Sequence, residues 1–261
     1  DGGPVNLGDF ADIIVTNNGV LGINTDTIVN FGTANLRLSG RDKSFIALRG
    51  AGGVTFPPNW SISGFTLLVD TNTMATGSWT VTTNGRISQS SSKHWSSAGT
   101  NFGYPYMAPL TLTLNGNLTV DPGGEITVDG AGYVSQCGPG RQEGDRGGCH
   151  GGQGGDNDGT PPYGNTYGSI LRPTNAGSGG FWGNWNDAPG GGRMRLIVTG
   201  QTTVNGQMTA RAPIRSNPGG AGGSIWLTTA SLAGTGMIDA SCVKDTNPGG
   251  GGGRVAVYVT N

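Results

Sequence analysis

Three passes of one pattern run from Gly190 towards the end of the chain: GGGRMRLIVTGQTTVNGQMTARA (190–212), GGAGGSIWLTTASLAGTGMIDASC (219–242) and GGGGGRVAVYVTN (249–261). Each pass begins with a glycine cluster and continues as a strand of alternating polar and apolar residues. The first two passes add a short turn and a second strand. Arg193, Ser224 and Arg254 occupy the same place in successive passes, 31 and then 30 residues apart. A fixed period in this range predicts a solenoid, in which each repeat buries its apolar side by stacking on its neighbours.

The same alternation appears earlier in the chain, in LTLTLNGNLTVDPGGEITVDG (110–130). Successive side chains of a strand point to opposite faces, so the apolar residues of this pass are expected to point inward: Leu110, Leu112, Leu114, Leu118, Val120, Ile126 and Val128. Aligning the passes predicts three stacked inward columns: Leu112, Leu196, Leu227 and Val257; Leu114, Val198, Thr229 and Val259; and Ile126, Met208 and Ile238. The sequence therefore predicts an all-β solenoid of the parallel β-helix type, with almost no α-helix.

The chain divides into two parts of different regularity. Residues 1–62 carry short strand candidates between Asn, Gly or Arg-Asp turns, and are expected to form either the first coils of the solenoid or a small β cap. Residues 63–261 are expected to form the solenoid, unless both parts make one continuous domain. Near the start of this second part, FTLLVD (65–70) predicts a strand, TNTMATG (71–77) a turn, and SWTVTTNGRISQSS (78–91) two short strands.

An insertion at 131–192 interrupts the solenoid pattern. It has no apolar alternation and is dense in glycine. A loop of this length inside a compact domain is either functional or disordered. Two features indicate that the insertion is ordered. One is a predicted disulfide between Cys137 and Cys149, and the other is its set of aromatic residues: Tyr163, Tyr167, Trp182 and Trp185. Glycine runs also pack as extended polyproline II strands, since the missing side chain allows backbones to approach closely. The insertion is the first candidate for a functional surface.

Charge and composition limit the function classes. The net charge is −1 with 12% charged residues, so no basic track for nucleic acid is present. No apolar run has the roughly 18–20 residues that a membrane span needs. The low Lys and Glu content and the abundance of Asn, Thr and Gly indicate an extracellular or cell-surface protein. There are three cysteines, so pairing Cys137 with Cys149 leaves Cys242 either buried or available to link two chains.

The three glycine-led passes, with GGCHGGQGG (147–155) and YGSILRPTNAGSGG (167–180), resemble glycine-rich segments of large secreted or surface β-helix proteins. The families concerned are adhesin-like parallel β-helix proteins and, more loosely, the pectate-lyase-like superfamily. The resemblance covers about residues 110–261. It implies a right-handed parallel β-helix outside the cell, acting in adhesion, surface coating or polysaccharide contact. No catalytic motif carries over to particular residues.

Candidate metal ligands are few. GGQGGDNDG (151–159) fits most of a calcium-binding nonapeptide, through Asp156 and Asp158. However, Asp158 stands where an aliphatic residue should anchor the turn, and the motif occurs once. Cys137, Cys149 and His150 supply at most three zinc ligands, whereas a structural zinc site has four. We therefore expect no cofactor, with Ca²⁺ as the alternative.

Candidate catalytic residues come from one outward column formed by Asp129, Arg211 and Ser241 on successive coils. A carboxylate beside an arginine on one face suits polysaccharide cleavage. The same arrangement is more commonly a cross-strand ion pair on a solvated face. We therefore expect no catalytic site, with Asp129 and Arg211 as the alternative.

Aromatic side chains are the stronger indication of binding. Planar rings on a rigid sheet suit sugar rings or a protein partner. Alternatively, the rings of the insertion cover the outward columns of the sheet. The candidate binding residues are Tyr163, Tyr167, Trp182, Trp185, Trp226 and Tyr258.

The expected function is that of an extracellular structural or adhesive β-solenoid. Its partner would be a polysaccharide, a cell surface, or copies of itself stacked into a fibre or sheath. Stacking is considered because RVAVYVTN (254–261) is a strand with an open edge. The alternative is a β-helix enzyme that binds or degrades polysaccharides.

Overall fold

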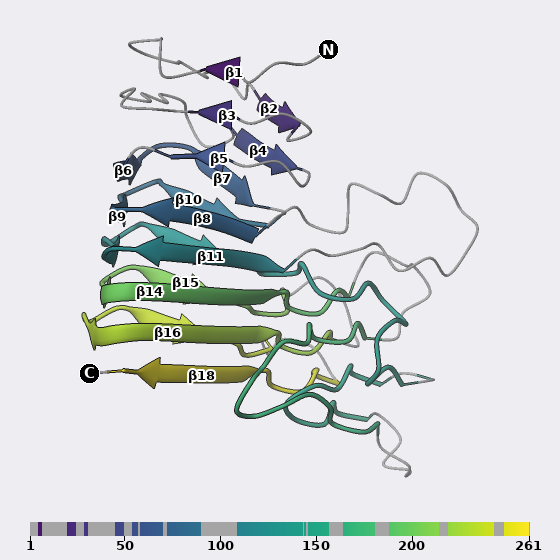
Figure 1. Ribbon diagram of the computed structural model, residues 1–261. Coiled ribbons are helices and arrows are strands. Elements are labelled where there is room, and N and C mark those ends of the chain that lie inside the picture. The colour runs from purple at the N-terminus through teal and green to yellow at the C-terminus, as the bar shows by residue number, and fades with distance from the viewer. Residues whose placement is uncertain are drawn as a thin grey trace.

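The computed structural model describes the following residues: 5–6, 20–24, 29–30, 45–49, 54–56, 58–69, 72–89, 109–142, 144, 146–156, 164–180, 188–213, 219–242 and 248–260. The described residues contain strands and turns but no helix (Figure 1). All ladders between named strands are parallel, so the chain advances by one coil between paired strands. This confirms the prediction of an all-β, solenoid-like architecture.

Within the described part of the chain, the strands form three parallel sheets. The smallest sheet has the order β1 (Val5–Asn6), β3 (Val29–Asn30) and β5 (Val54–Thr55). The seven-stranded sheet has the order β2 (Val20–Asn24), β4 (Phe45–Arg49), β7 (Thr66–Val69), β10 (Arg86–Ser88), β13 (Glu125–Thr127), β15 (Gln207–Thr209) and β17 (Met237–Asp239). Strands on both sides of residue 62 thus belong to one sheet.

The eight-stranded sheet contains the longest strands and carries the candidate site. Its main order is β6 (Asn59–Ile62), β9 (Ser78–Val81), β12 (Leu118–Val120), β14 (Arg193–Val204), β16 (Ser224–Ala233) and β18 (Arg254–Val259). Beside this path, β11 (Leu110–Asn115) pairs with both β14 and β8 (Asn72–Thr76). The first half of β14 therefore continues the ladder from β11, and its second half continues the ladder from β12.

The core lies between the sheets and consists of the predicted apolar columns. Leu112, Leu196 and Leu227 are fully buried and pair in register, with Val257 as the next member. The other two predicted columns are also in register, from Leu114 through Val198 and Thr229 to Val259 and from Ile126 through Met208 to Ile238. The alternation thus predicted both the inward faces and the one-coil register.

One local prediction is wrong. The segment 71–77 was expected to be a turn, but Asn72–Thr76 is the strand β8, which pairs with β11. Thr73 and Ala75 are buried while Met74 is 72% exposed, which is the alternation of a strand with one face in the core. Its polar composition concealed a strand whose partner, β11, lies almost 40 residues along the chain.

The glycine clusters before β14, β16 and β18 do not form strands. Instead, hydrogen bonds recur at every third residue: the amides of Gly177 and Gly180 donate to the carbonyls of Gly191 and Ala188, both at 2.9 Å. The same step joins Tyr133 and Gln136 to Gly177 and Gly180, and Gly219 and Gly222 to Pro248 and Gly251. A period of three is that of a polyproline II helix, whereas a strand has a period of two.

We call these packed segments the glycine bundle; its described residues are 131–142, 146–156, 175–180, 188–192, 219–223 and 248–253. The bundle lies where β14, β16 and β18 begin, beside the stacked coils (Figure 1). Its backbones approach so closely that a Cβ on Gly177 would lie 2.1 Å from the Ala221 carbonyl oxygen. The described part of the insertion is therefore ordered, and it packs against the solenoid.

The coil that contains β18 differs from those before it. In the inward columns, Ile225, Leu227 and Thr229 of β16 are fully buried. Their partners on β18 are exposed to 44% (Val255), 38% (Val257) and 53% (Val259). Leu232 and Met237 in the preceding coil are also exposed. The structure therefore presents an apolar cross-section of the solenoid to solvent, which we call the terminal coil face.

Candidate functional site

The segment 167–175 of the insertion crosses the outer face of the eight-stranded sheet. The residues that hold it occupy one repeat position, because Arg193, Ser224 and Arg254 are paired in register on successive coils. Arg193 Nη1 donates to the Thr174 carbonyl at 2.9 Å, and Ser224 Oγ donates to the Asn175 carbonyl at 2.5 Å. The coils of β14 and β16 thus contribute one anchor each.

The third anchor is Arg254, whose Nε and Nη2 donate to the Tyr167 carbonyl at 3.1 and 3.0 Å. Tyr258, also on β18, donates its hydroxyl to the Leu171 carbonyl at 2.7 Å. Because these side chains all bind backbone carbonyls, the path of the segment is defined without a requirement for particular side chains on it. The exposed Ile170 and Leu171 lie at its turn.

A groove of about 410 Å³ lies between this segment and the sheet. Its wall is formed by Pro173 and Thr174. The floor and ends are formed by residues of β8, β11 and β14 with the residue before β11: Met74, Pro109, Thr111, Thr113, Arg193, Met194, Arg195 and Ile197. The groove lining therefore includes two arginines and no acidic residue among the described residues.

Two rows of outward side chains run across the strands at the groove. One row places Met74, Thr113, Ile197 and Thr228 on adjacent strands, ending at Tyr258. The other pairs Thr111 with Arg195, then Trp226, then Ala256. Adjacent strands are about 4.8 Å apart, so the rows form an elongated surface along the solenoid axis. The groove occupies the part of this surface nearest β8, β11 and β14.

Arg195 and Trp226 form a cation–π pair beside the groove. The guanidinium carbon of Arg195 lies 4.4 Å from the Trp226 ring centroid. Tyr258 lies on the other side of this pair, with its ring centroid 6.5 Å from that of Trp226. The Trp226 and Tyr258 side chains are therefore partly engaged with neighbours, while the exposed Arg195 extends the row into the groove lining.

The chain matches no protein-family model, no curated protein and no solved structure. Among the described residues, no helix is long and apolar enough to span a membrane.

The remaining predicted aromatic residues have different positions. Tyr167 lies inside the glycine bundle, where its ring packs on His150 with centroids 4.8 Å apart. Its hydroxyl donates to the Ala176 carbonyl at 2.5 Å and lies 2.9 Å from Ser178 Oγ. Burial raises the pKa of Tyr167 well above its usual value. This ring therefore packs the insertion. The predictions for Tyr163, Trp182 and Trp185 fall outside the described residues.

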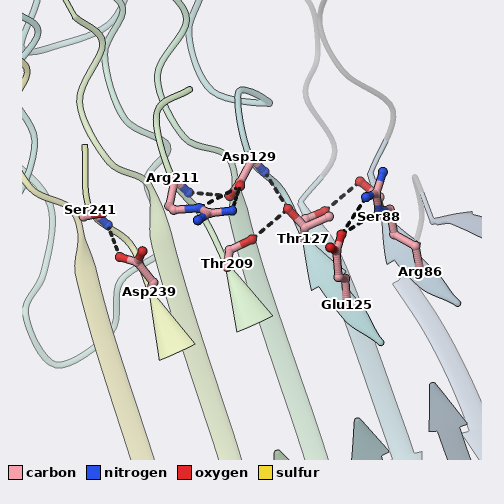
Figure 2. A network of polar contacts seen from close by, with 9 residues as sticks. All are labelled: Arg86, Ser88, Glu125, Thr127, Asp129, Thr209, Arg211, Asp239 and Ser241. Atoms are coloured by element: carbon pink, nitrogen blue, oxygen red, sulfur yellow. Dashed lines mark hydrogen bonds and ion pairs between the residues drawn. The ribbon is translucent and has the colours of Figure 1, made fainter. Parts of the chain in front are cut away.

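Asp129 and Arg211, the alternative catalytic residues, form an ion pair on the seven-stranded sheet side (Figure 2). Asp129 Oδ1 accepts from the Arg211 amide at 2.6 Å, and Oδ2 accepts from Nε and Nη2 of Arg211, both at 2.9 Å. Both carboxylate oxygens thus bind the partner residue. The ion pair links two coils. Asp129 could act as an acid or a base only if its contacts with Arg211 were broken.

The same face carries a polar network that runs from coil to coil (Figure 2). Arg86 pairs with Glu125 at 2.6 Å, and Thr209 Oγ1 donates to Thr127 Oγ1 at 2.8 Å. In the next coil, the Asp239 carboxylate accepts from the Ser241 amide at 2.7 Å. Such partly exposed contacts contribute up to about 1 kcal/mol each. Ser241, which was aligned with Asp129 and Arg211, thus bonds to Asp239 within its own coil.

The predicted disulfide is absent from the structure, where Cys137, Cys149 and Cys242 are all free thiols. The Cys149 sulfur lies inside the bundle and accepts from the Gly154 amide at 3.2 Å and from Gln142 Nε2 at 3.3 Å. The Cys149 side chain thus points to polar groups of Gln142 and Gly154 within the glycine bundle. Burial raises the pKa of all three thiols, which keeps them protonated.

No group of three or more His, Cys, Asp or Glu that could hold a metal occurs in the described part of the chain. Asp156 pairs with Arg146 at 3.5 Å, and Asp158 lies outside that part. His150 is fully buried, with Nδ1 2.7 Å from the Gly222 carbonyl oxygen. Burial lowers the pKa of His150, which favours the neutral ring. His150 therefore serves as a packing residue of the bundle.

The site contains two kinds of residue that sequence reasoning missed. Arg195 could have been found, because it takes the repeat position of Trp226 one coil earlier. Pro173 and Thr174 could not, because the insertion has no periodicity and its path depends on the anchors from later coils.

Proposed function

We propose that this protein is an extracellular adhesive β-solenoid of the right-handed parallel β-helix type, and that it binds polysaccharides in the groove. The groove with its anchored wall is the observation that carries the proposal. Right-handedness is proposed because crossovers between parallel strands of one sheet are right-handed in about 98% of cases. Binding of this kind requires no metal ion and no bond cleavage.

The groove has the chemistry that sugar rings require. Ile197, Met74 and Pro173 offer apolar surface for the C–H faces of a ring. Thr111 and Thr113 place their side-chain hydroxyls on the floor of the groove. Neither hydroxyl makes a hydrogen bond with the residues that the structure describes. These hydroxyls are thus available to hydroxyl groups of a ligand.

The test is affinity electrophoresis of the whole protein in gels that contain soluble polysaccharides. We expect Thr113→Trp to fill the groove and weaken binding about 10-fold or more, the equivalent of about 1.4 kcal/mol. Thr119→Trp is the matched control, because Thr119 is partly exposed on β12 of the same sheet and does not line the groove. The proposal fails if no polysaccharide retards the protein or if both variants lose binding equally.

The alternative enzymatic function is tested on the same mixtures. A lyase acting on a uronic-acid polymer raises the ultraviolet absorbance, and a hydrolase releases new reducing ends. The adhesive proposal expects neither signal with any polymer that the protein binds. A signal that Asp129→Asn abolishes would favour the polysaccharide-degrading enzyme.

A second candidate function, self-association, is favoured by the terminal coil face. The strand β18 is paired with β16 along one edge, and Val255, Val257 and Val259 continue buried columns to the surface. Apolar patches of this kind mark interfaces. We propose that a second copy of this chain covers the face, because its addition would continue the stacking that already joins β14, β16 and β18.

Sedimentation velocity over a range of concentrations tests this association. We expect species larger than the monomer for the natural chain and only monomer for Val257→Lys, since a buried unpaired ammonium is strongly disfavoured at such an interface. Ala256→Lys is the control on the outward face of the same strand. A dimer or a series of larger polymers would both support the proposal. A natural chain that stays monomeric throughout would refute it.

A further inference from the structure

We infer that the groove is selective for anionic polysaccharides and that Arg195 binds their carboxylate or sulfate groups. This inference rests on the proposed polysaccharide binding and adds the class of ligand. It begins from a difference among the arginines. Three of them bind carboxylates and two anchor the segment 167–175: Arg86, Arg146, Arg211, Arg193 and Arg254. The guanidinium groups of Arg141, Arg172 and Arg195 make no hydrogen bond or ion pair with any described residue, and of these three only Arg195 lines the groove.

The Trp226 ring keeps this unpaired guanidinium in place. The guanidinium carbon lies over the ring at 4.4 Å from its centroid, so a cation–π contact holds the group without a hydrogen bond. A planar guanidinium offers paired N–H donors that match the two oxygens of a carboxylate or sulfate. Because the ring already limits the conformations of the side chain, less entropy is lost when an anion binds.

The surroundings of Arg195 also favour an anion. Arg193 lines the same groove, and none of the described lining residues is acidic. The described carboxylates of Glu125, Asp129 and Asp239 belong to the strands and turns of the seven-stranded sheet. The described lining of the groove is thus positively charged, although the overall net charge of the protein is −1.

The groove suits a sugar chain better than an acidic peptide. An extended peptide gains affinity by adding its backbone to an open strand edge. The floor strand β11 has no open edge, because it pairs with β8 on one side and with β14 on the other. A peptide would therefore leave backbone groups unpaired on apolar surface, whereas a sugar chain meets Thr111 and Thr113 with hydroxyls. Thr111 is paired directly with Arg195, so a hydroxyl and a charged group lie side by side.

The experiment compares two polymers that share a backbone and differ in charge, carboxymethyl cellulose and hydroxyethyl cellulose. Dissociation constants are measured by titration calorimetry with the whole protein at low ionic strength. We expect the natural chain to bind the carboxylated polymer about 10- to 100-fold more tightly, the range for a hydrogen bond to a charged group. Arg195→Gln should remove this preference and leave binding of the neutral polymer unchanged.

The control is Arg86→Gln, which removes the same charge from an exposed arginine on the seven-stranded sheet. We expect this variant to keep the preference. Equal binding of the two polymers by the natural chain would overturn the assignment of the ligand class and leave the proposed function standing. If both variants lose the preference for the carboxylated polymer equally, the preference depends on net charge. That result would also overturn the assignment of the ligand class. If neither polymer binds but poly-glutamate does, the ligand is an acidic peptide and both proposals fail.

Discussion

Replacing Gly222 with alanine is expected to lower the free energy of unfolding by about 3 kcal/mol or more. A Cβ at this position would lie 1.9 Å from the Ala240 carbonyl oxygen and 2.6 Å from the Gly253 amide nitrogen. Both are backbone atoms of stacked segments, so neither can move away as a side chain would. Urea unfolding followed by circular dichroism measures the loss.

Gly252→Ala is the matched control for this substitution, because Gly252 holds the same repeat position one coil later. It is exposed, and a Cβ there would meet no atom within 4 Å. We expect stability to stay within about 0.5 kcal/mol of the natural chain. Equal destabilisation by the two substitutions would show that close backbone contact is not what requires glycine in the bundle.

Leu196→Ala is expected to cost about 2–5 kcal/mol, the range for removing a large apolar side chain from a core. Leu196 is fully buried in the centre of its column, between Leu112 and Leu227. Neighbouring coils are held by continuous ladders on both sides and cannot collapse into the space. The same urea titration measures the effect.

Val257→Ala lies in the same column, and we expect it to cost less than about 1 kcal/mol. Val257 is already 38% exposed, so truncation removes little buried surface. The comparison must be made at concentrations where the chain is monomeric, because association would bury Val257 and enlarge the effect. A Leu196→Ala protein as stable as Val257→Ala would contradict the stacked-column description of the core.

Solenoid alternation allowed much of this fold to be predicted from sequence. Leu112, Leu196 and Leu227 are the same residue type at the same place in successive coils, so their register follows from the repeat alone. The strand β8 was missed because its buried residues, Thr73 and Ala75, are small or polar and carry a weak pattern. Its burial depends on the neighbouring coil, which a local pattern does not contain.

The candidate site could be predicted only in part, for a similar reason. Trp226 and Tyr258 lie in regular strands, so their outward direction was readable. The groove also requires a wall, and the wall depends on hydrogen bonds from Arg193 and Ser224 to backbone carbonyls of the insertion. Carbonyls carry no sequence signal. The structure does not contain the predicted Cys137–Cys149 bridge. Spacing along the chain does not reveal that the Cys149 sulfur is buried and accepts a hydrogen bond from the Gly154 amide.

The glycine bundle also has a consequence for the order of folding. His150 meets Gly222 across 72 residues of sequence, and Arg254 meets Tyr167 across 87. The amides of Gly148 and Gly151 donate to the carbonyls of Gly219 and Gly252, which belong to later coils. During synthesis the insertion therefore emerges before the segments that satisfy its backbone, and contacts of such long range form slowly. We therefore expect the coils ahead of the insertion to assemble first, and the insertion to close onto the solenoid only after the β18 coil has been made.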